Sequence, residues 1–115
     1  FEVIRDGALP VKKIVVASSQ AVYGESGYAN SKGAVSYPAT LRPQSQLKDS
    51  RWEMQDAATG EPLKPILNRE DRPLHTETIY GVSKLAEEKL SIGMGRAFGI
   101  PVVALRYAVT YGPRQ

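Results

Sequence analysis

Two stretches of the chain have a continuous core of β-branched and apolar residues, Val11–Ser18 and Val102–Arg106. Such runs are typical of strands that are covered on both faces, as in parallel sheets. Between them, the residues from about Tyr80 to Phe98 repeat apolar positions at helical spacing, and Gly99 is a suitable left-handed terminator. Strand, helix and strand in this order predict a right-handed crossover unit with parallel pairing.

The predicted helix has an apolar stripe, which we expect to face the sheet, and charged residues, which we expect on the other side. The stripe consists of Val82, Leu85, Ala86, Leu90, Met94, Ala97 and Phe98, and the outer charged residues are Glu87, Glu88 and Arg96. At the start of the chain, a short helix is predicted to end at Gly7, and Pro10 keeps the next connection extended.

The segment from about residue 25 to residue 78 interrupts the crossover unit. It holds prolines at 38, 43, 62, 65 and 73 and glycines at 27, 33 and 60, which favour an irregular insertion. Loops of this length in compact domains are functional lids or disordered segments. Apolar residues such as Leu41, Trp52, Met54, Leu63 and Leu67 favour partial ordering over the sheet edge.

The chain looks like an excerpt of a longer protein. It begins at Phe1 rather than methionine, and its last residues, Gly112–Gln115, suggest a loop that leaves a strand. Two strands do not form a stable parallel sheet by themselves. We therefore expect residues 1–115 to be the central and C-terminal part of one α/β domain, with the neighbouring strands supplied by other sequence.

Composition narrows the class of protein. Charged residues make up 23% and apolar residues 42% of the 115 residues, a globular balance that argues against disorder. No apolar run approaches the ~20 residues that a membrane span needs, and no signal peptide is visible, so the cytoplasm is the simplest compartment. The net charge of +3 is scattered, and its longest basic run is Lys12–Lys13. We therefore expect neither a nucleic-acid partner nor a membrane partner.

Few metal ligands are available. The chain has no cysteine, which excludes disulfides, a thiol nucleophile and a thiolate metal site. His75 is the only histidine, which excludes a multi-histidine metal site, and a lone loop histidine is most often solvated. The sequence predicts no metal centre.

Tyr80 and Lys84 open the predicted helix and lie four residues apart, so their Cβ atoms would be ~5–6 Å apart on one face. Tyrosine in water has a pKa of ~10 and is a poor base at neutral pH. An ammonium at ~4 Å would stabilise the phenolate by about 4 kcal/mol at an effective dielectric of ~20, or roughly three pK units. Tyr80 is therefore a candidate proton shuttle.

The same spacing occurs at Tyr28 and Lys32. The residues after Lys32 have no apolar repeat at helical period, and Pro38 blocks continuation. We expect no helix to hold this second pair, and we prefer Tyr80 over Tyr28.

Ser18 and Ser19 follow the first predicted strand. The carboxyl ends of strands are where open α/β sheets bind ligands. A serine pair at this point either contacts a ligand or caps a turn or helix. The residues alone leave both interpretations open.

Three short sequence motifs follow one another along the chain. They are Ser18–Gly24 after a strand, Tyr80-x-x-x-Lys84 at the start of a helix, and Leu105–Tyr107 with Tyr111–Gln115 after the next strand. In this order they resemble the extended short-chain dehydrogenase/reductase family, specifically its nucleotide-sugar epimerases and dehydratases. The resemblance implies an α/β fold that is part of a Rossmann-type doubly wound parallel sheet, incomplete in this chain. It also implies a homodimer for the full-length protein.

The resemblance implies three catalytic residues. Ser19 would hydrogen-bond the sugar hydroxyl or ketone, and Tyr80 would be the general base in contact with both substrate and cofactor. Lys84 would favour the phenolate of Tyr80 and hold the nicotinamide ribose of the cofactor, NAD. Tyr80 would take the proton of the sugar 4-hydroxyl while the hydride passes to NAD, and a 4-keto intermediate would then accept the hydride on its other face.

The last motif departs from the family pattern. The resemblance places the backbone of Ala108 beside the nicotinamide, as a weaker cofactor contact. At Val109 many relatives carry an asparagine that meets the diphosphate of the nucleotide sugar. Valine cannot donate that hydrogen bond, so this substrate-binding position differs here.

The long insertion narrows the resemblance further. With Tyr37-Pro38, Arg51-Trp52-Glu53 and Gly60–Leu63 inside it, the layout is most similar to that of bacterial dTDP-L-rhamnose 4-epimerases. Their corresponding insert often carries paired cysteines, which are absent here.

Three alternatives remain open. A nucleotide-sugar 4,6-dehydratase often has an acidic pair directly after the catalytic serine, where this chain has Gln20-Ala21, which favours an epimerase. A reductase would consume NADH or NADPH. The chain by itself could also be an inactive fragment or an interaction module, because the glycine-rich loop that binds the NAD phosphates does not occur in it.

Overall fold

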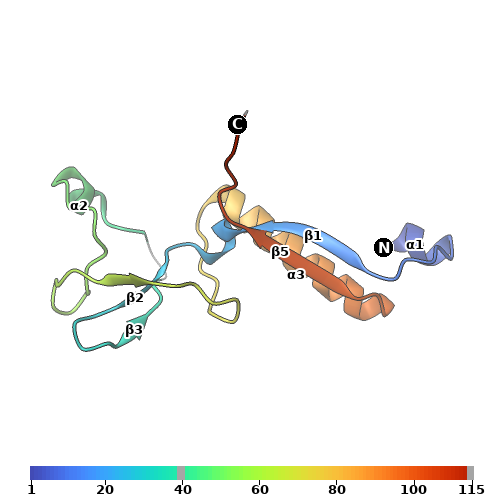
Figure 1. The fold of residues 1–115 in the computed structure, drawn as a ribbon, viewed down its shortest axis with the longest axis horizontal. Coiled ribbons are helices and arrows are strands. Elements are labelled where there is room, and N and C mark those ends of the chain that lie inside the picture. Colours follow the sequence, from blue (N-terminus) through green and yellow to red (C-terminus); the bar gives the residue numbers. More distant parts are fainter. Residues whose placement is uncertain (39–40, 114–115) are drawn as a thin grey trace. The chain divides into compact units, whose positions relative to one another are not determined.

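The computed structural model describes residues 1–38 and 41–113, which form two compact units. The first, called the sheet unit, comprises Phe1–Val22 and Thr78–Gln115, and the second, called the insertion unit, comprises Tyr23–Glu77. The elements of both are labelled in Figure 1. Arg114 and Gln115, the end of the predicted final loop, lie outside the described residues.

The sheet unit is the predicted crossover. Strand β1 (Ile14–Ser19) pairs in parallel with β5 (Val102–Tyr107), in a register that runs from Ile14 opposite Val102 to Ser19 opposite Tyr107. Helix α3 (Ile79–Phe98) lies along this two-stranded sheet (Figure 1). The α/β fold class with a parallel sheet is confirmed.

Only one face of the sheet is covered by the described residues. Val16 and Ser18 of β1 are buried, whereas Val15, which precedes them, and Val103 and Leu105 of β5 are exposed. The prediction that both strands are covered on both faces is therefore wrong for this chain. The physical reason is that α3 supplies one helical layer, while a parallel sheet needs two.

Helix α3 begins and ends as its sequence predicts. The Thr78 hydroxyl accepts a hydrogen bond of 3.0 Å from the amide of Gly81, which caps the first turn. At the other end, Gly99 adopts the left-handed conformation with φ 67°. Inside the helix, Gly95 allows a close approach to β5, because a Cβ atom there would meet Val102 and lie 2.6 Å from the carbonyl oxygen of Ile100.

The faces of α3 differ from the prediction. Leu90 is 68% exposed, and Val82, Ala86 and Ala97 are also exposed, while Glu88 is only 3% exposed. The apolar stripe predicted from the sequence therefore includes residues of the exposed face of α3 as well as residues that face the sheet. Glu88 lies four residues after Lys84, on the side of the helix that faces the strands. There its carboxylate accepts hydrogen bonds from Ser18 and Arg106. Glu87 and Arg96 are exposed, as predicted.

The first helix, α1 (Glu2–Asp6), ends at Gly7 as predicted, but not by a left-handed glycine. Gly7 has φ −83°, and the positive φ of 46° belongs to Ala8. Position 7 favours glycine because there is no room for a side chain: a Cβ atom would lie 2.8 Å from the carbonyl oxygen of Val3.

The insertion unit contains ordered elements, while its predicted position over the edge of the parallel sheet stays a prediction. Strands β2 (Gly27–Ala29), β3 (Val35–Ser36) and β4 (Lys64–Ile66) form an antiparallel sheet in the order β3-β2-β4, and α2 (Gln44–Lys48) is a short helix. A small core forms from Tyr28, Met54 and Leu63. Other apolar residues that favoured ordering, Trp52, Leu41 and Leu67, are exposed instead.

Arg72 joins the two ends of the insertion unit. Its buried guanidinium donates hydrogen bonds to the carbonyl oxygens of Tyr23 (3.3 Å) and Glu25 (2.8 Å) and lies 4.6 Å from the centre of the Tyr37 ring. Arg72 lies near the end of the insertion unit, and it satisfies backbone carbonyls at the start of that unit. His75 nearby is exposed, as expected for a loop histidine.

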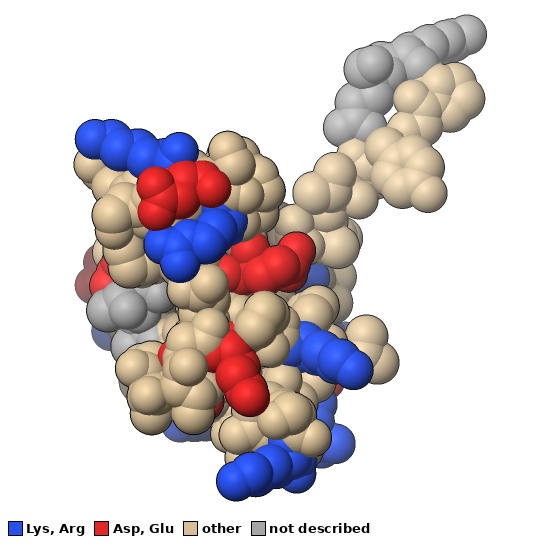
Figure 2. All heavy atoms as spheres, turned by 90° about the vertical axis from the view of Figure 1, so that its left-hand side faces the viewer, with Lys and Arg blue, Asp and Glu red and all other residues tan. Residues whose placement is uncertain are grey.

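Charges on the surface are mixed in sign. On the face drawn in Figure 2, cationic and anionic side chains alternate. In the insertion unit, ion pairs join Arg42 to Glu25 (3.2 Å) and Arg51 to Asp49 (3.0 Å). Within residues 1–38 and 41–113, no helix is both long and apolar enough to cross a bilayer.

Candidate functional site

The candidate site lies in the sheet unit, where β1 and β5 end and α3 begins. Ser19 is the last residue of β1, and Tyr80 stands in the first turn of α3. Because Ser19 pairs with Tyr107, Ala108 directly follows the residue opposite Ser19. The fold thus gathers the predicted site residues at one end of the parallel pair, where open α/β sheets bind ligands.

Lys84 connects α3 to β1. Its ammonium donates hydrogen bonds of 2.8 Å to the carbonyl oxygen of Ala17 and to Oε2 of Glu87. The hydrogen bond to Glu87 raises the pKa of Lys84, to which the neighbouring Tyr80 adds a smaller Coulombic contribution. Lys84 is therefore charged at neutral pH. An ammonium has three donors, so one N–H is left for a further acceptor.

Tyr80 presents its side chain to solvent, with 57% of its surface exposed. It lies one helical turn before Lys84, as the sequence predicts. Its backbone carbonyl accepts a hydrogen bond of 2.8 Å from the hydroxyl of Ser83, which belongs to the first turn of the helix. The phenol is therefore accessible to a ligand at the head of α3.

The two serines have different partners. Ser18 is buried and donates its hydroxyl to Glu88, whereas Ser19 is half-buried and accepts a hydrogen bond of 3.1 Å from the amide of Ala21. The turn-capping interpretation therefore describes what Ser19 does in this structure. Capping uses the lone pairs of the hydroxyl, and its proton can still be donated to a ligand.

Ala108 and Val109 follow β5 in an irregular, exposed segment. The carbonyl oxygen of Ala108 accepts a hydrogen bond of 3.4 Å from the hydroxyl of Thr110. Val109 is exposed and offers an apolar side chain only. The backbone of this segment is accessible to a ligand, but the side chain at 109 supplies no polar contact.

The second tyrosine-lysine pair is not held by a helix, as predicted. Tyr28 lies in β2 and is 8% exposed, and Lys32 lies in the turn after the strand. The Tyr28 hydroxyl donates a hydrogen bond of 3.3 Å to Oε2 of Glu25. Burial, and then the charge of Glu25, raise the pKa of Tyr28 above its ordinary value. Both causes oppose formation of a phenolate.

Sequence reasoning missed the buried carboxylate of Glu88. Its Oε2 accepts hydrogen bonds from Ser18 Oγ (2.8 Å) and Arg106 Nε (3.1 Å), and its Oε1 accepts one from Arg106 Nη2 (2.7 Å). The hydrogen bonds from Arg106 are the main cause that lowers the pKa of Glu88. A signal was available, since Glu88 follows Lys84 by four residues and an arginine stands inside the following apolar strand.

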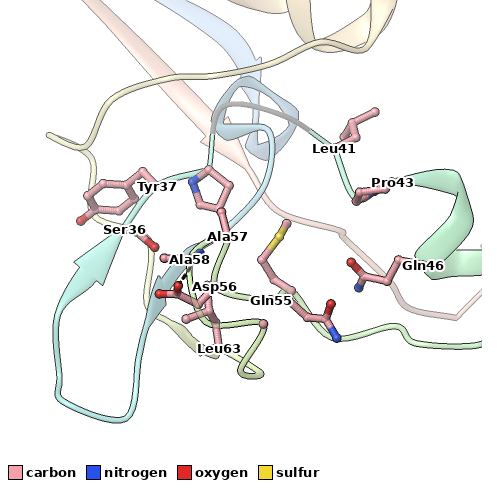
Figure 3. Close-up of a pocket in the computed structure, with 13 residues that line it drawn as sticks. Ser36, Tyr37, Leu41, Pro43, Gln46, Gln55, Asp56, Ala57, Ala58 and Leu63 are labelled. Atoms are coloured by element: carbon pink, nitrogen blue, oxygen red, sulfur yellow. Dashed lines mark hydrogen bonds between the residues drawn. The ribbon is translucent and has the colours of Figure 1, made fainter.

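The insertion unit has a separate hollow of about 710 Å³. Figure 3 shows it between Tyr37 on one side and Pro43 and Gln46 on the other. Its carboxylate, Asp56, accepts hydrogen bonds from the amides of Ala58 (2.9 Å) and Thr59 (3.0 Å), which lower its pKa. Because that acid stabilises its own turn and no predicted site residue lines the hollow, it is a weaker candidate.

Within the part of the chain that the structure describes, no group of three or more histidine, aspartate or glutamate side chains could hold a metal ion.

The parallel crossover is of the Rossmann-like α/β class. The chain belongs to the NAD dependent epimerase/dehydratase family, because the sequence model of that family matches residues 56–115, about half of the chain. The matched range contains Tyr80, Lys84, Ala108 and Val109, and Ser19 lies before it. Membership implies NAD as the cofactor at the level of the family.

Two curated proteins are similar to this chain. A dTDP-L-rhamnose 4-epimerase of Burkholderia thailandensis is 32% identical over 107 residues, which is 93% of this chain and 28% of that protein. An uncharacterized UDP-glucose epimerase of Bacillus subtilis, YtcB, is 56% identical over 36 residues, which is 31% of this chain and 11% of that protein. The chain thus spans less than a third of either relative. No solved structure matches it at a comparable level of significance.

Proposed function

We propose that this chain is the central part of an NAD-dependent nucleotide-sugar 4-epimerase of the dTDP-L-rhamnose 4-epimerase type. The observation that carries the proposal is the geometry of Lys84, whose helix also presents Tyr80 and whose ammonium is hydrogen-bonded to β1 two residues before Ser19. The similarity to a rhamnose 4-epimerase extends over 93% of the chain and so includes most of the insertion.

The residues at this site fit the nicotinamide half of NAD. Lys84 has an unused N–H, Tyr80 is exposed, and the backbone of Ala108 is accessible, which together suit a ribose and a carboxamide. The pyrophosphate would need a glycine-rich loop at a helix N-terminus, and this chain has no such sequence. We propose that other parts of the complete protein hold that half.

In the proposed mechanism, Tyr80 reacts as the phenolate, which the positive charge of Lys84 stabilises, and it becomes the neutral phenol when it takes the proton of the sugar 4-hydroxyl. Ser19 donates its hydroxyl proton as a hydrogen bond to the 4-oxygen, where negative charge accumulates. NAD, which Lys84 and the backbone of Ala108 would hold, would supply a reversible acceptor for the hydride of carbon 4. The 4-keto sugar turns over between these steps, so Tyr80 returns the proton when the other face is reduced.

At position 109, this chain would contact the substrate differently from relatives that carry asparagine there. Its exposed apolar side chain cannot donate a hydrogen bond to a diphosphate, so we propose that it packs against an apolar part of the substrate. Backbone amides or residues from elsewhere in the protein would then bind the diphosphate.

Product analysis separates the proposed reaction from its relatives. The complete protein is incubated with dTDP-L-rhamnose and catalytic NAD, and the sugar is followed by NMR. Formation of the 4-epimer without net NADH supports an epimerase. Because rhamnose has no 6-hydroxyl, a 4,6-dehydratase is identified in a parallel reaction by loss of water from a nucleotide sugar that has one, such as UDP-glucose. A reductase is identified by stoichiometric oxidation of NADH or NADPH with a 4-keto nucleotide sugar. The exposed Gln20, which stands where dehydratases often carry an acid, favours the first outcome.

The inactive-fragment alternative has its own test. The isolated 115-residue chain is dialysed against NAD, and no appreciable binding is expected, because the phosphate-binding loop is absent from its sequence. Appreciable affinity would overturn the view that the cofactor site is incomplete in this chain.

We also propose that the complete protein is a homodimer. The outer face of α3 exposes Val82 and Leu90, although such residues are usually buried. Light scattering of the complete protein is expected to give a dimer mass, and Leu90→Glu is expected to shift it towards a monomer. A monomeric wild-type protein would contradict this proposal.

A further inference from the structure

Among the residues of the sheet unit that the structure describes, the most completely buried charged group is the carboxylate of Glu88, which is 3% exposed. Both of its oxygens are used, since they accept hydrogen bonds from Ser18 Oγ and from two nitrogens of Arg106 at 2.7–3.1 Å. One carboxylate therefore joins α3 to β1 and to β5 at the same time.

The position of this junction relates it to the candidate site. Ser18 and Arg106 lie opposite each other in the register of the two strands, and the next pair is Ser19 and Tyr107. Along α3, Glu88 follows Lys84 by one helical turn and Tyr80 by two turns. The junction thus connects α3 and β1, which carry Tyr80, Lys84 and Ser19, with β5, which leads into Ala108, and it lies one residue before the strands end.

A contribution to the stability of the fold is a weak explanation for burying a charged group such as Glu88. Burying an ion pair costs desolvation energy that its attraction often only offsets, and apolar residues of similar volume are frequently as stable. What three directional hydrogen bonds provide is a defined geometry between the helix and the two strands.

We propose that Glu88 is a positioning residue for the epimerase reaction. Held by Ser18 and Arg106, it sets the placement of Tyr80 and Lys84 relative to the strand end that carries Ser19. This inference rests on the proposed function, and Glu88 itself touches neither substrate nor cofactor. The physical argument is that a displacement of about 1 Å in a reacting group can lower a rate by ~10²-fold.

The test uses the complete protein with Glu88→Gln, and Lys89→Gln as the control. Glutamine has nearly the same shape but only one accepting oxygen, so at least one hydrogen bond of the junction is lost. We expect kcat to fall by about 10–100-fold with little change in KM, because orientation and not binding is impaired. The exposed Lys89 should be replaceable with no change in either constant.

Hydrogen exchange supplies a readout that needs no activity. In Glu88→Gln, the amides at the ends of β1 and β5 are expected to exchange faster than in Lys89→Gln, whereas the amides of residues 23–77 are expected to be unchanged. Unchanged kcat in Glu88→Gln would overturn the proposal. So would a loss of kcat that is accompanied by faster exchange throughout the protein, because that pattern marks general destabilisation.

Two further outcomes are informative. If Glu88→Gln does not fold, Ser18→Ala decides, since it removes a single hydrogen bond: a several-fold lower kcat at unchanged KM supports the proposal, and wild-type kcat overturns it. If the wild-type protein epimerises no nucleotide sugar, the proposed function fails. Local exchange at the strand ends then still shows whether Glu88 fixes their geometry.

Discussion

The chain contains the pattern Tyr-x-x-x-Lys twice, and the two copies have different structures. Tyr80 and Lys84 lie on consecutive turns of α3, with Tyr80 exposed and Lys84 hydrogen-bonded to the neighbouring strand. Tyr28 is buried in β2, and Lys32 lies in the turn that follows. The spacing is identical, but only the helix places the two side chains on one face.

The surroundings reinforce this difference. Tyr28 is enclosed in a small apolar core and donates its hydroxyl to a carboxylate, and both effects raise its pKa and keep it protonated. Tyr80 instead is exposed, and the ammonium of Lys84 follows it by one helical turn, where it interacts favourably with a negative charge at Tyr80. A spacing motif gains chemical meaning only through the element that carries it and the charges beside it.

The largest expected effect comes from removing each phenol in turn. In the complete enzyme, Tyr80→Phe is expected to lower kcat by about 10²–10⁴-fold, because the proton shuttle is lost while the ring remains. Tyr28→Phe is expected to leave kcat close to the wild-type value. Steady-state kinetics on the nucleotide sugar measures both variants, and equal losses would show that the choice between the two tyrosines is wrong.

The two lysines offer a matched second test. Lys84→Met is expected to lower turnover by roughly 10²-fold and to move the rising limb of the pH–rate profile to higher pH, because the phenolate loses its neighbouring positive charge. Lys32→Met removes an exposed turn residue and should change neither quantity. A pH profile of Lys84→Met that coincides with that of the wild type would remove Lys84 from the proposed mechanism.

A third comparison tests how the helix is held against the strands. Gly95→Ala is expected to lower the free energy of unfolding by about 1–3 kcal/mol, because its Cβ would meet Val102 and the carbonyl oxygen of Ile100. Gly93→Ala, two residues away, meets nothing within 4 Å and should stabilise the helix by up to about 1 kcal/mol. Urea unfolding of the two variants measures the difference, and equal stabilities would contradict the close packing at Gly95.

Local patterns predicted the elements of the sheet unit well. The helix starts one residue before the predicted Tyr80 and ends at Phe98, and the second strand extends one residue beyond Arg106. These boundaries follow from short-range physics: a hydroxyl cap, a left-handed glycine and runs of β-branched residues. The faces of the elements were predicted less well, because burial depends on which layers surround them.

In the candidate site, too, local patterns predicted the elements better than they predicted which side chains are buried. Tyr80 and Lys84 follow from helical spacing, but Glu88 was assigned to solvent because its charge resembles that of its neighbour Glu87. Its burial depends on Ser18 and Arg106, which are distant in sequence and meet only through the parallel register. Likewise, the hydrogen bond from Ala21 to Ser19 distinguishes the two serines in a way that residue type cannot.

The smallest expected effect concerns the first turn of α3, which carries Tyr80. Thr78→Ala removes the hydroxyl that accepts the amide of Gly81 and is expected to cost about 1 kcal/mol in the free energy of unfolding. Ser83→Ala is the control, because its hydroxyl only donates back to the carbonyl of Tyr80 and alanine is a better helix former. If the cap holds the phenol in place, Thr78→Ala also lowers kcat while Ser83→Ala does not. Equal kcat in the two variants would mean that the turn keeps its geometry without the cap, and that the contacts of Lys84 with Ala17 and Glu87 suffice to hold the head of the helix.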